Sequence, residues 1–264
     1  MGPRLPWCVL ALAWLAAPAA AVAQVPRVLD ASPRTDFLSR FAYHLAIETL
    51  SGDDPQFQWD ADFGGEFDIV GGPRGRVAAD FNYEAILGEQ LQPFDPNQGN
   101  YAIELVGGPR WGRLEAAVVF HHTSRHLGDR AKDFGIAWNL LGAQATWTAA
   151  GSRDTWQLQA RATTIVMKDA VDYGGEYSAN GLYVRHWRPR LAVVGRAPGV
   201  VRTIDAGVSR RGAQAGARGE VALRIRGGGA DVEIHAGVER RIEAAIFQPR
   251  PVTWALLGLR VLSR

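Results

Sequence analysis

The densest group of residues that could do chemistry is the segment 121–129, which reads His121-His122-Thr123-Ser124-Arg125-His126-Leu127-Gly128-Asp129 and holds three of the six histidines. A histidine beside a serine can act as general base for a serine nucleophile, and a carboxylate such as that of Asp129 can orient the histidine. Residues two apart on an extended strand are separated by roughly 6.6 Å. His122 and Ser124 would therefore need favourable rotamers or a local bend to meet.

Two other interpretations of this segment stay open. His122 and His126 lie about 13 Å apart on an extended strand, too far to share a metal ion unless the chain turns after Ser124. A helical His-x-x-x-His zinc pair would also need a helix and a glutamate that are missing here, so we predict neither a metal site nor a cofactor. In the third interpretation the side chains are structural, and His121, Arg125 and His126 anchor a loop or meet lipid headgroups.

The elements that must position this segment follow from a period-2 alternation of apolar and polar residues. It is clear over residues 56–64, 76–84, 156–163, 217–226 and 231–239, and such alternation predicts half-buried β-strands. We expect about twelve strands, at 37–49, 56–69, 75–87, 100–108, 112–125, 133–149, 154–168, 177–187, 190–208, 215–226, 230–241 and 252–262. Pro198-Gly199 could divide the ninth strand in two.

The connections between these strands alternate in length. Those after the even strands are short and turn-like, as in Gly71-Gly72-Pro73-Arg74 and Gly107-Gly108-Pro109-Arg110, whereas 88–100, 125–132 and 168–175 are longer and more polar. An even strand number with tight turns at one end and longer loops at the other is typical of transmembrane barrels. We therefore predict an all-β fold, an antiparallel up-and-down transmembrane β-barrel over residues 37–264.

The N-terminus resembles a cleaved export signal. Arg4 precedes an apolar run over residues 7–17, and Ala21-Val22-Ala23 has the small-x-small form of a cleavage site. We expect a signal peptide over 1–23, Sec-dependent export, and a periplasmic segment over 24–36. Cys8 is the only cysteine, so the mature chain would have no disulfide. No later run is apolar for about 18 residues, so any membrane must be crossed by strands.

These observations predict a location in the outer membrane of a Gram-negative bacterium. The expected partners are outer-membrane lipid, including lipopolysaccharide, and the barrel assembly machinery. The net charge of +2 argues against a nucleic-acid partner. A soluble β-sandwich or calyx would show the same alternation with its apolar face inward. Aromatic residues at strand ends favour the membrane, where interfacial girdles form: Phe37, Phe57, Tyr101, Trp111, Trp156, Trp187 and Trp254.

If the apolar face meets lipid, the polar face lines a lumen. The second and third strands then contribute Asp60, Asp62, Asp80 and Glu84, and the tenth contributes Arg218, Arg224 and Arg226. Acid and base on opposite walls could select solutes in a narrow channel. Alternatively, these groups pair with one another and fill the interior, because buried charges must be compensated.

His122, Ser124 and His126 share the parity of the apolar residues before them, so we expect them on the outer wall at headgroup height. The string His122-x-Ser124-x-His126-Leu127-Gly128-Asp129 resembles a motif in a bacterial outer-membrane family defined as a domain of unknown function. That resemblance implies a barrel and no established activity. Arg125 and Arg130 stand where the family has a serine and a glutamate.

His122-Thr123-Ser124 also resembles the His-x-Ser pair on the outer wall of the lipid A deacylases. This resemblance implies catalytic roles for His122 and Ser124, although Arg125 interrupts the deacylase pattern and the third catalytic acid has no clear counterpart. We predict a structural or narrow-channel barrel, with an outer-leaflet lipid hydrolase as the alternative. Enzyme activity is left open; if present, it is that of a serine esterase acting on lipid acyl chains.

Overall fold

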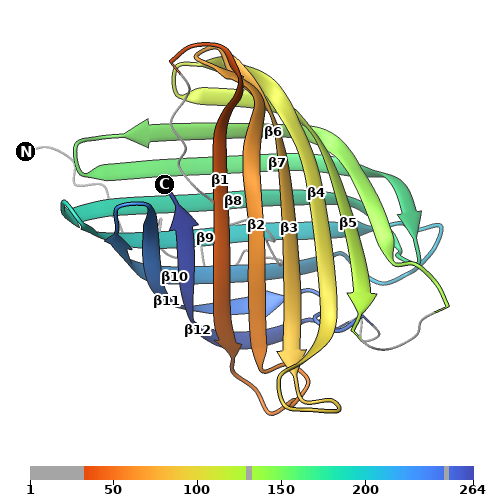
Figure 1. The fold of residues 1–264 in the computed structure, drawn as a ribbon. Helices are drawn as coiled ribbons and strands as arrows, with labels where there is room; N and C mark the ends of the chain where they lie inside the picture. Colours follow the sequence, from red (N-terminus) through yellow and green to blue (C-terminus); the bar gives the residue numbers. More distant parts are fainter. Residues whose placement is uncertain (1–32, 129–132, 247–249) are drawn as a thin grey trace, which may run out of the picture.

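The computed structural model describes residues 33–128, 133–246 and 250–264. They form a closed barrel in which each strand pairs antiparallel with its sequence neighbours and the first pairs with the last (Figure 1). This confirms the predicted fold of twelve antiparallel strands. The strands are β1 (Asp36–Leu50), β2 (Trp59–Gly72), β3 (Gly75–Gly88), β4 (Asp95–Trp111), β5 (Leu114–Leu127), β6 (Ala137–Ala150), β7 (Asp154–Asp169), β8 (Tyr173–Arg188), β9 (Leu191–Ile204), β10 (Gln214–Arg226), β11 (Ala230–Arg241) and β12 (Val252–Ser263).

Several strand boundaries differ from the sequence-based expectation, including those of β4 and β9. β4 begins at Asp95, so the connection before it is shorter than the expected 88–100. β9 runs through Pro198 without a break and ends at Ile204. Pro198 pairs with Asn180 of β8, while on the β10 side the pairing is interrupted between Val200 and Arg196. The missing N–H of the proline therefore removes no ladder hydrogen bond.

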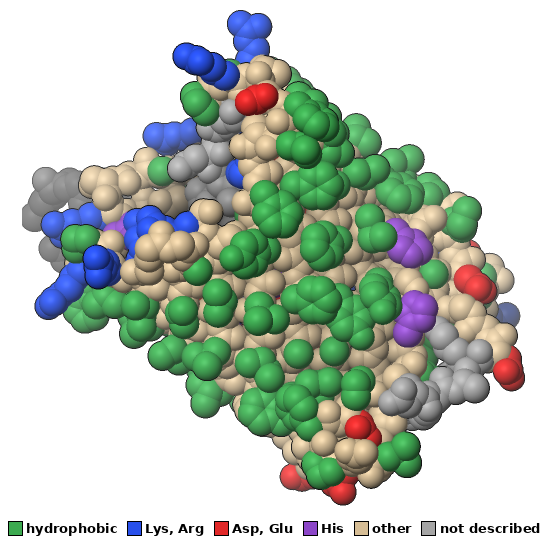
Figure 2. All heavy atoms as spheres, viewed as in Figure 1, with side chains coloured by type: hydrophobic (Ala, Val, Ile, Leu, Met, Phe, Trp, Pro, Cys, Tyr) green, Lys and Arg blue, Asp and Glu red, His purple; other side chains and the backbone are tan. Residues whose placement is uncertain are grey.

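The outer wall is apolar and the interior is charged. Phe41, Phe81, Ile103, Val118 and Leu259 are among the large apolar side chains that are exposed around the barrel, and Figure 2 shows such side chains covering one face of it. Glutamate, aspartate and arginine side chains are buried inside. A soluble sandwich or calyx has the opposite arrangement, and a wall in contact with lipid requires this one.

Aromatic side chains at the strand ends divide into two groups. Trp111, Trp156 and Trp187 are exposed on the outside, as in an interfacial girdle. The expectation was wrong for Phe57 and Trp254, which are 6% and 4% exposed and stack on each other with ring centroids 5.9 Å apart. Trp254 has the inward parity of β12, so its indole packs inside the barrel beneath the guanidinium of Arg241.

Apolar clusters lie inside both ends of the barrel, with the charged groups between them. Leu50, Phe57, Ile86, Trp254 and Leu256 pack together at the end that carries the longer loops. Leu182, Val184, Ala192, Val194 and Ala222 pack at the end that carries the short turns. The described part of the chain contains no helix long and apolar enough to cross a bilayer. The predicted signal peptide and most of the 24–36 segment lie outside the described residues.

Candidate functional site on the outer wall of β5

The segment singled out in the sequence forms the last part of β5, and its residues alternate between the two faces. Val119 is fully buried on the lumen side, whereas Val118 and Phe120 are exposed on the outer wall. By the same alternation His122, Ser124 and His126 lie on the outer wall, near the end of the barrel that carries the loops. Figure 2 shows histidine side chains within the apolar wall on this side of the barrel.

His122 has a partner on the neighbouring strand. His122 and Asn139 are directly paired in the β5–β6 register, and Nδ1 of His122 lies 2.6 Å from Oδ1 of Asn139. The amide nitrogen of Asn139 donates to the sulfur of Met167 at 3.6 Å, which fixes the orientation of the amide. With a carbonyl oxygen facing it, Nδ1 of His122 carries the proton and donates. The Nε2 atom of the neutral imidazole is then an acceptor, which is the form a general base requires.

Ser124 lies between two histidines along the strand and is hydrogen-bonded to the second. Its hydroxyl is hydrogen-bonded to Nε2 of His126 over 2.7 Å. The His126 ring also packs edge-on against Tyr101 of β4, with centroids 5.1 Å apart. The sequence predicted His122 as the partner of Ser124; the structure instead places the hydroxyl on the His126 side.

The remaining residues of the segment do not share this outer face. Nδ1 of His121 lies 2.9 Å from Glu104 inside the barrel. Arg125 is buried there, and its guanidinium donates to the main-chain carbonyls of Glu243 and Ala244 at 2.9 and 3.2 Å. Arg125 therefore anchors the β11–β12 connection from within the barrel and does not reach lipid headgroups. Asp129, the predicted orienting acid, lies outside the described residues.

Asn139 is the residue that sequence reasoning missed. A carboxylate was the expected orienting group, and β6 (Ala137–Ala150) contains none. A usable signal was present, because Asn139 is a lone amide at an outward position between Ala137 and Leu141. A polar side chain on an otherwise apolar lipid-facing row needs a partner, and the paired position on β5 holds His122.

The predicted lumen charges lie inside the barrel and are paired locally. Asp60 accepts from Arg241 at 2.6 Å, and Glu84 is 3.0 Å from the same guanidinium. Asp62 accepts from Asn82 at 2.7 Å and faces His44. Asp80 shares the inward face, and its register neighbours on the flanking strands, Glu66 and Glu104, are themselves acids that pair with arginines.

The tenth strand contributes the basic side of these pairs. Arg218 contacts Glu48, Glu220 and Glu239, and Arg224 lies 2.7 Å from Glu233. Arg226 lies 4.0 Å from Asp231 at the short-turn end. Arg196 and Arg260 each bridge Glu220 and Glu233, and these four side chains are at most 5% exposed. Compensated ion pairs therefore fill the interior between β9 and β12. This supports the interpretation in which paired charges fill the lumen, over that of a channel with acid and base on opposite walls.

Glu48, Glu220 and His235 present potential metal-ligand atoms within 4.8 Å of one another. Arg218 donates to both carboxylates, at 2.6 and 2.7 Å, and His235 lies 2.8 Å from Glu48. A guanidinium thus supplies the positive charge at this cluster. Separately, a cavity of about 110 Å³ lies towards the loop end, lined by residues that include Asn100, Arg125, Trp138, Asn180 and Arg202. That volume suits a few waters or a very small polar molecule.

No family model matches this sequence, and no curated protein matches it. Solved structures match its fold. An outer-membrane channel from Pseudomonas putida F1 has a TM-score of 0.54 at 12% identity, over 91% of this chain and 99% of that one. Outer-membrane phospholipase A from Escherichia coli, in a variant that replaces an active-site asparagine with alanine, has a TM-score of 0.53 at 12% identity, over 86% of this chain and 91% of that one. The Salmonella typhi outer-membrane phospholipase, solved as a dimer with bound calcium, has a TM-score of 0.52 at 14% identity, over 84% of this chain and 90% of that one. At these identities the likeness shows the fold alone, and that fold is the closed antiparallel barrel of bacterial outer-membrane proteins.

Proposed function

We propose that this chain is an outer-membrane serine esterase that hydrolyses acyl ester bonds of lipids in the outer leaflet. In this proposal Ser124 is the nucleophile, His122 is the general base and Asn139 orients His122. The observation that carries it is the 2.6 Å hydrogen bond between His122 Nδ1 and Asn139 Oδ1. It supplies the third group that a serine–histidine pair needs and that the sequence did not reveal.

The chemistry is a two-step acyl transfer. The Ser124 oxygen attacks the ester carbonyl while Nε2 of His122 takes the hydroxyl proton; the protonated imidazole then gives that proton to the departing alcohol. Water, activated by the same nitrogen, next releases the fatty acid and restores the serine. Asn139 keeps the proton of the neutral imidazole on Nδ1. As an amide, it stabilises the imidazolium less than a carboxylate would.

In the resting structure the Ser124 hydroxyl points to His126, so catalysis requires it to turn towards His122. Serine side chains move among three staggered positions, and the two histidines lie on either side of Ser124 along the strand. We assign the base to His122 rather than to His126 because the His122 ring is oriented by an amide that is itself held by Met167. His126 then holds the hydroxyl when no substrate is bound.

The position of Ser124 favours a membrane lipid over a soluble ester. The side chain lies on the outer wall. Below it are the exposed apolar side chains of Phe120 on β5, Ile103 on β4 and Leu141 on β6. Lipid acyl chains would lie against these residues, which brings the ester linkages to the height of Ser124. Two structural neighbours are phospholipases, an activity that agrees with this assignment. Location in a Gram-negative outer membrane, contact with lipopolysaccharide and insertion by the barrel assembly machinery belong to the same proposal.

The test uses the purified chain in detergent with two substrates, a glycerophospholipid and lipid A, and follows fatty-acid release by mass spectrometry. Ser124→Ala and His122→Ala should each abolish release, while Thr164→Ala removes an exposed hydroxyl elsewhere on the barrel and should not. A sulfonyl fluoride should label Ser124 in the wild type. A heat-shift gel establishes that each variant is folded. Full activity in folded Ser124→Ala, or no release from either lipid by the wild type, rejects the esterase.

A further inference from the structure

The two ends of the barrel differ in charge. The short-turn rim comprises the connections after β2, β4, β6, β8 and β10, together with the residues flanking β1 and β12 at that end. Its exposed arginines are Arg34, Arg74, Arg113, Arg153, Arg185, Arg188, Arg190 and Arg264. Among the described residues of this rim, Asp36 is the exposed acid, while Asp154 is paired with Arg185 at 3.1 Å and Asp231 is buried.

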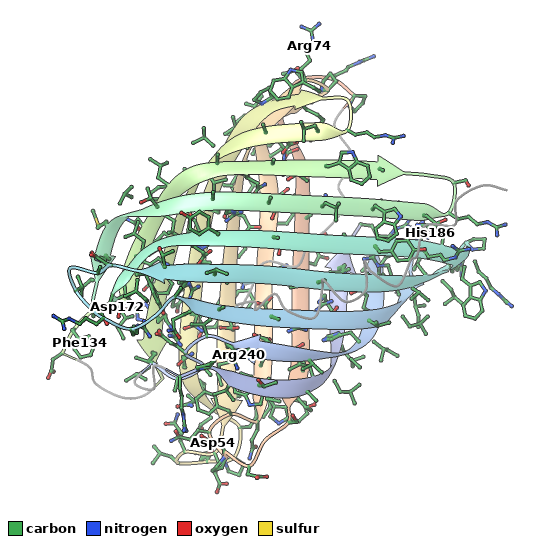
Figure 3. The ribbon with its side chains drawn as sticks, turned by 180° about the vertical axis from the view of Figure 1, so that it is seen from behind. Asp54, Arg74, Phe134, Asp172, His186 and Arg240 are labelled. Atoms are coloured by element: carbon green, nitrogen blue, oxygen red, sulfur yellow. The ribbon has the colours of Figure 1, made fainter. Side chains whose placement is uncertain are left out.

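The opposite, loop rim comprises the connections after the odd strands. Its described residues include the exposed acids Asp53, Asp54, Glu89, Asp133 and Asp169, together with the exposed Arg210, Arg240 and Arg250. Figure 3 shows Arg74 and His186 at one end of the barrel and Asp54 and Asp172 at the other. Basic side chains gather at the short-turn side of the face in Figure 2, and acidic ones at the loop side. The basic surplus is therefore a property of one rim and not of the whole surface.

Tryptophans are interleaved with these arginines. Trp111 and Trp187 are 60% and 74% exposed, and each lies within two residues of an exposed arginine. Trp156 lies in β7, three residues after the exposed Arg153, and is 48% exposed. Exposed indoles favour the boundary between hydrocarbon and headgroups. The neighbouring guanidiniums then lie at the level of the lipid phosphates, which arginine binds through paired hydrogen bonds.

We propose that the short-turn rim binds the phosphate groups of anionic glycerophospholipids in the membrane leaflet that surrounds it. The arrangement favours lipid over a protein or polymer partner. Arginines occupy the turns after β2, β4, β6 and β8 and flank both β1 and β12, so they encircle the barrel. A ring of arginines interleaved with indoles suits a shell of lipids around the barrel. A protein or polymer partner would instead need the arginines grouped on one side of the rim. This inference requires only that the barrel lies in a membrane, and it does not depend on the esterase.

The experiment compares two triple variants with equal change in charge. One removes Arg113, Arg153 and Arg188 from the short-turn rim by substitution with glutamine; the other makes the same substitution at Arg210, Arg240 and Arg250 on the loop rim. Each protein is incubated with mixed micelles of phosphatidylglycerol and phosphatidylcholine, and bound lipids are counted by native mass spectrometry. A heat-shift gel shows that both variants are folded.

We expect the wild type and the loop-rim variant to retain phosphatidylglycerol in preference to phosphatidylcholine. The short-turn variant should bind phosphatidylglycerol roughly tenfold less well or worse, since it lacks three of the arginines that attract the anionic headgroups. Raising the salt concentration should weaken the wild-type preference. Equal retention by both variants, or no preference in the wild type, overturns the proposal. Binding to peptidoglycan that depends on these arginines, without any lipid preference, would replace the lipid with a polymer and also overturn it.

Discussion

The guanidinium of Arg218 forms two hydrogen bonds of 2.6 Å with the carboxylate of Glu48, joining β10 to β1 across the interior of the barrel. The same guanidinium contacts Glu239 and Glu220. Both partners of the central pair are largely shielded from water, with side-chain exposures of 15% and 7%. Removal of one partner from such a pair lowers the stability of the folded state, because the charge that remains is buried without compensation.

Arg218→Gln should therefore destabilise the barrel by about 3–5 kcal/mol. Urea unfolding of the protein in lipid vesicles, followed by tryptophan fluorescence, measures the change. The control is Arg210→Gln, which removes the same charge from an exposed loop and should change stability by no more than about 0.5 kcal/mol. Identical unfolding midpoints for the two variants would contradict the structural role given to Arg218.

The paired interior also predicts the electrical behaviour of the barrel. Arg196, Glu220, Glu233 and Arg260 are buried against one another, so hydrated ions have no continuous path beside them. The reconstituted wild type should show no steady conductance in a planar bilayer. The double variant Glu233→Ala/Arg260→Ala removes one charge of each sign and should permit intermittent ion flow. A stable open level in the wild type would restore the channel interpretation.

Asn139→Ala should lower esterase activity roughly 100-fold, because the His122 ring loses the acceptor that fixes its tautomer. Asn139→Asp preserves an acceptor at the same place and should retain far more activity. The measurement is kcat on a micellar ester, with heat-shift gels for both variants. If Asn139→Ala is fully active, the amide does not orient the base.

The two histidines that flank Ser124 should differ in their contribution. His122→Ala should be as inactive as Ser124→Ala, since it removes the base itself. His126→Ala should stay within about tenfold of the wild type, because His126 holds the hydroxyl only in the resting arrangement. The rate of sulfonyl fluoride labelling reports on the same distinction without a lipid substrate. The reverse order of effects would assign the base to His126.

The ion pair between Arg211 and Asp172 on the loop rim should break in acid. Arg211 donates to both oxygens of Asp172, at 2.5 and 2.7 Å, and thereby joins the β9–β10 connection to the β7–β8 connection. Burial alone would raise the pKa of Asp172, but hydrogen bonds from Arg211 and Ser209 outweigh it and lower that pKa below its ordinary value. A lowered pKa means that the contact is complete above the usual carboxyl range and is lost as pH falls through the folded-state pKa.

Hydrogen exchange of residues 205–213 should therefore be slow at neutral pH and accelerate in acid. Asp172→Asn removes the titrating group, so exchange in that variant should be faster at neutral pH and should lose this acid response. A wild-type exchange rate that is flat from pH 7 to the acid range, after correction for intrinsic exchange, would exclude the proposed role of Asp172.

The fold was largely readable from the sequence, because alternation specifies both the strand positions and the two faces. Pro198 illustrates the limit of that reading. A proline suggests a broken strand, and only the pairing of β8, β9 and β10 shows that its missing N–H falls where no ladder bond is formed. Its position at a strand end also misplaced Trp254, because an aromatic residue there can belong to either face.

The site was readable only within one strand. His122 and Ser124 are two residues apart in sequence, and their common parity follows from the strand period. Asn139 lies on the next strand, and its pairing with His122 depends on the β5–β6 register, which the length of the connecting loop does not determine. Likewise, no local pattern could show that Glu48 and Arg218 would meet across the lumen.

The pairing of β1 with β12 has a consequence for the order of folding events. This pairing runs only from His44–Leu262 to Leu50–Leu256 and thus leaves the first part of β1 without a β12 neighbour. Glu48, which lies within the paired stretch, reaches Arg218 and His235 when the two end strands come together. In an open sheet Arg218 and His235 would lack their contacts with Glu48, and only the closed ring makes them. Barrel closure is thus coupled to the formation of buried ion pairs, so partially closed forms are disfavoured and the last strand pair forms in a cooperative step.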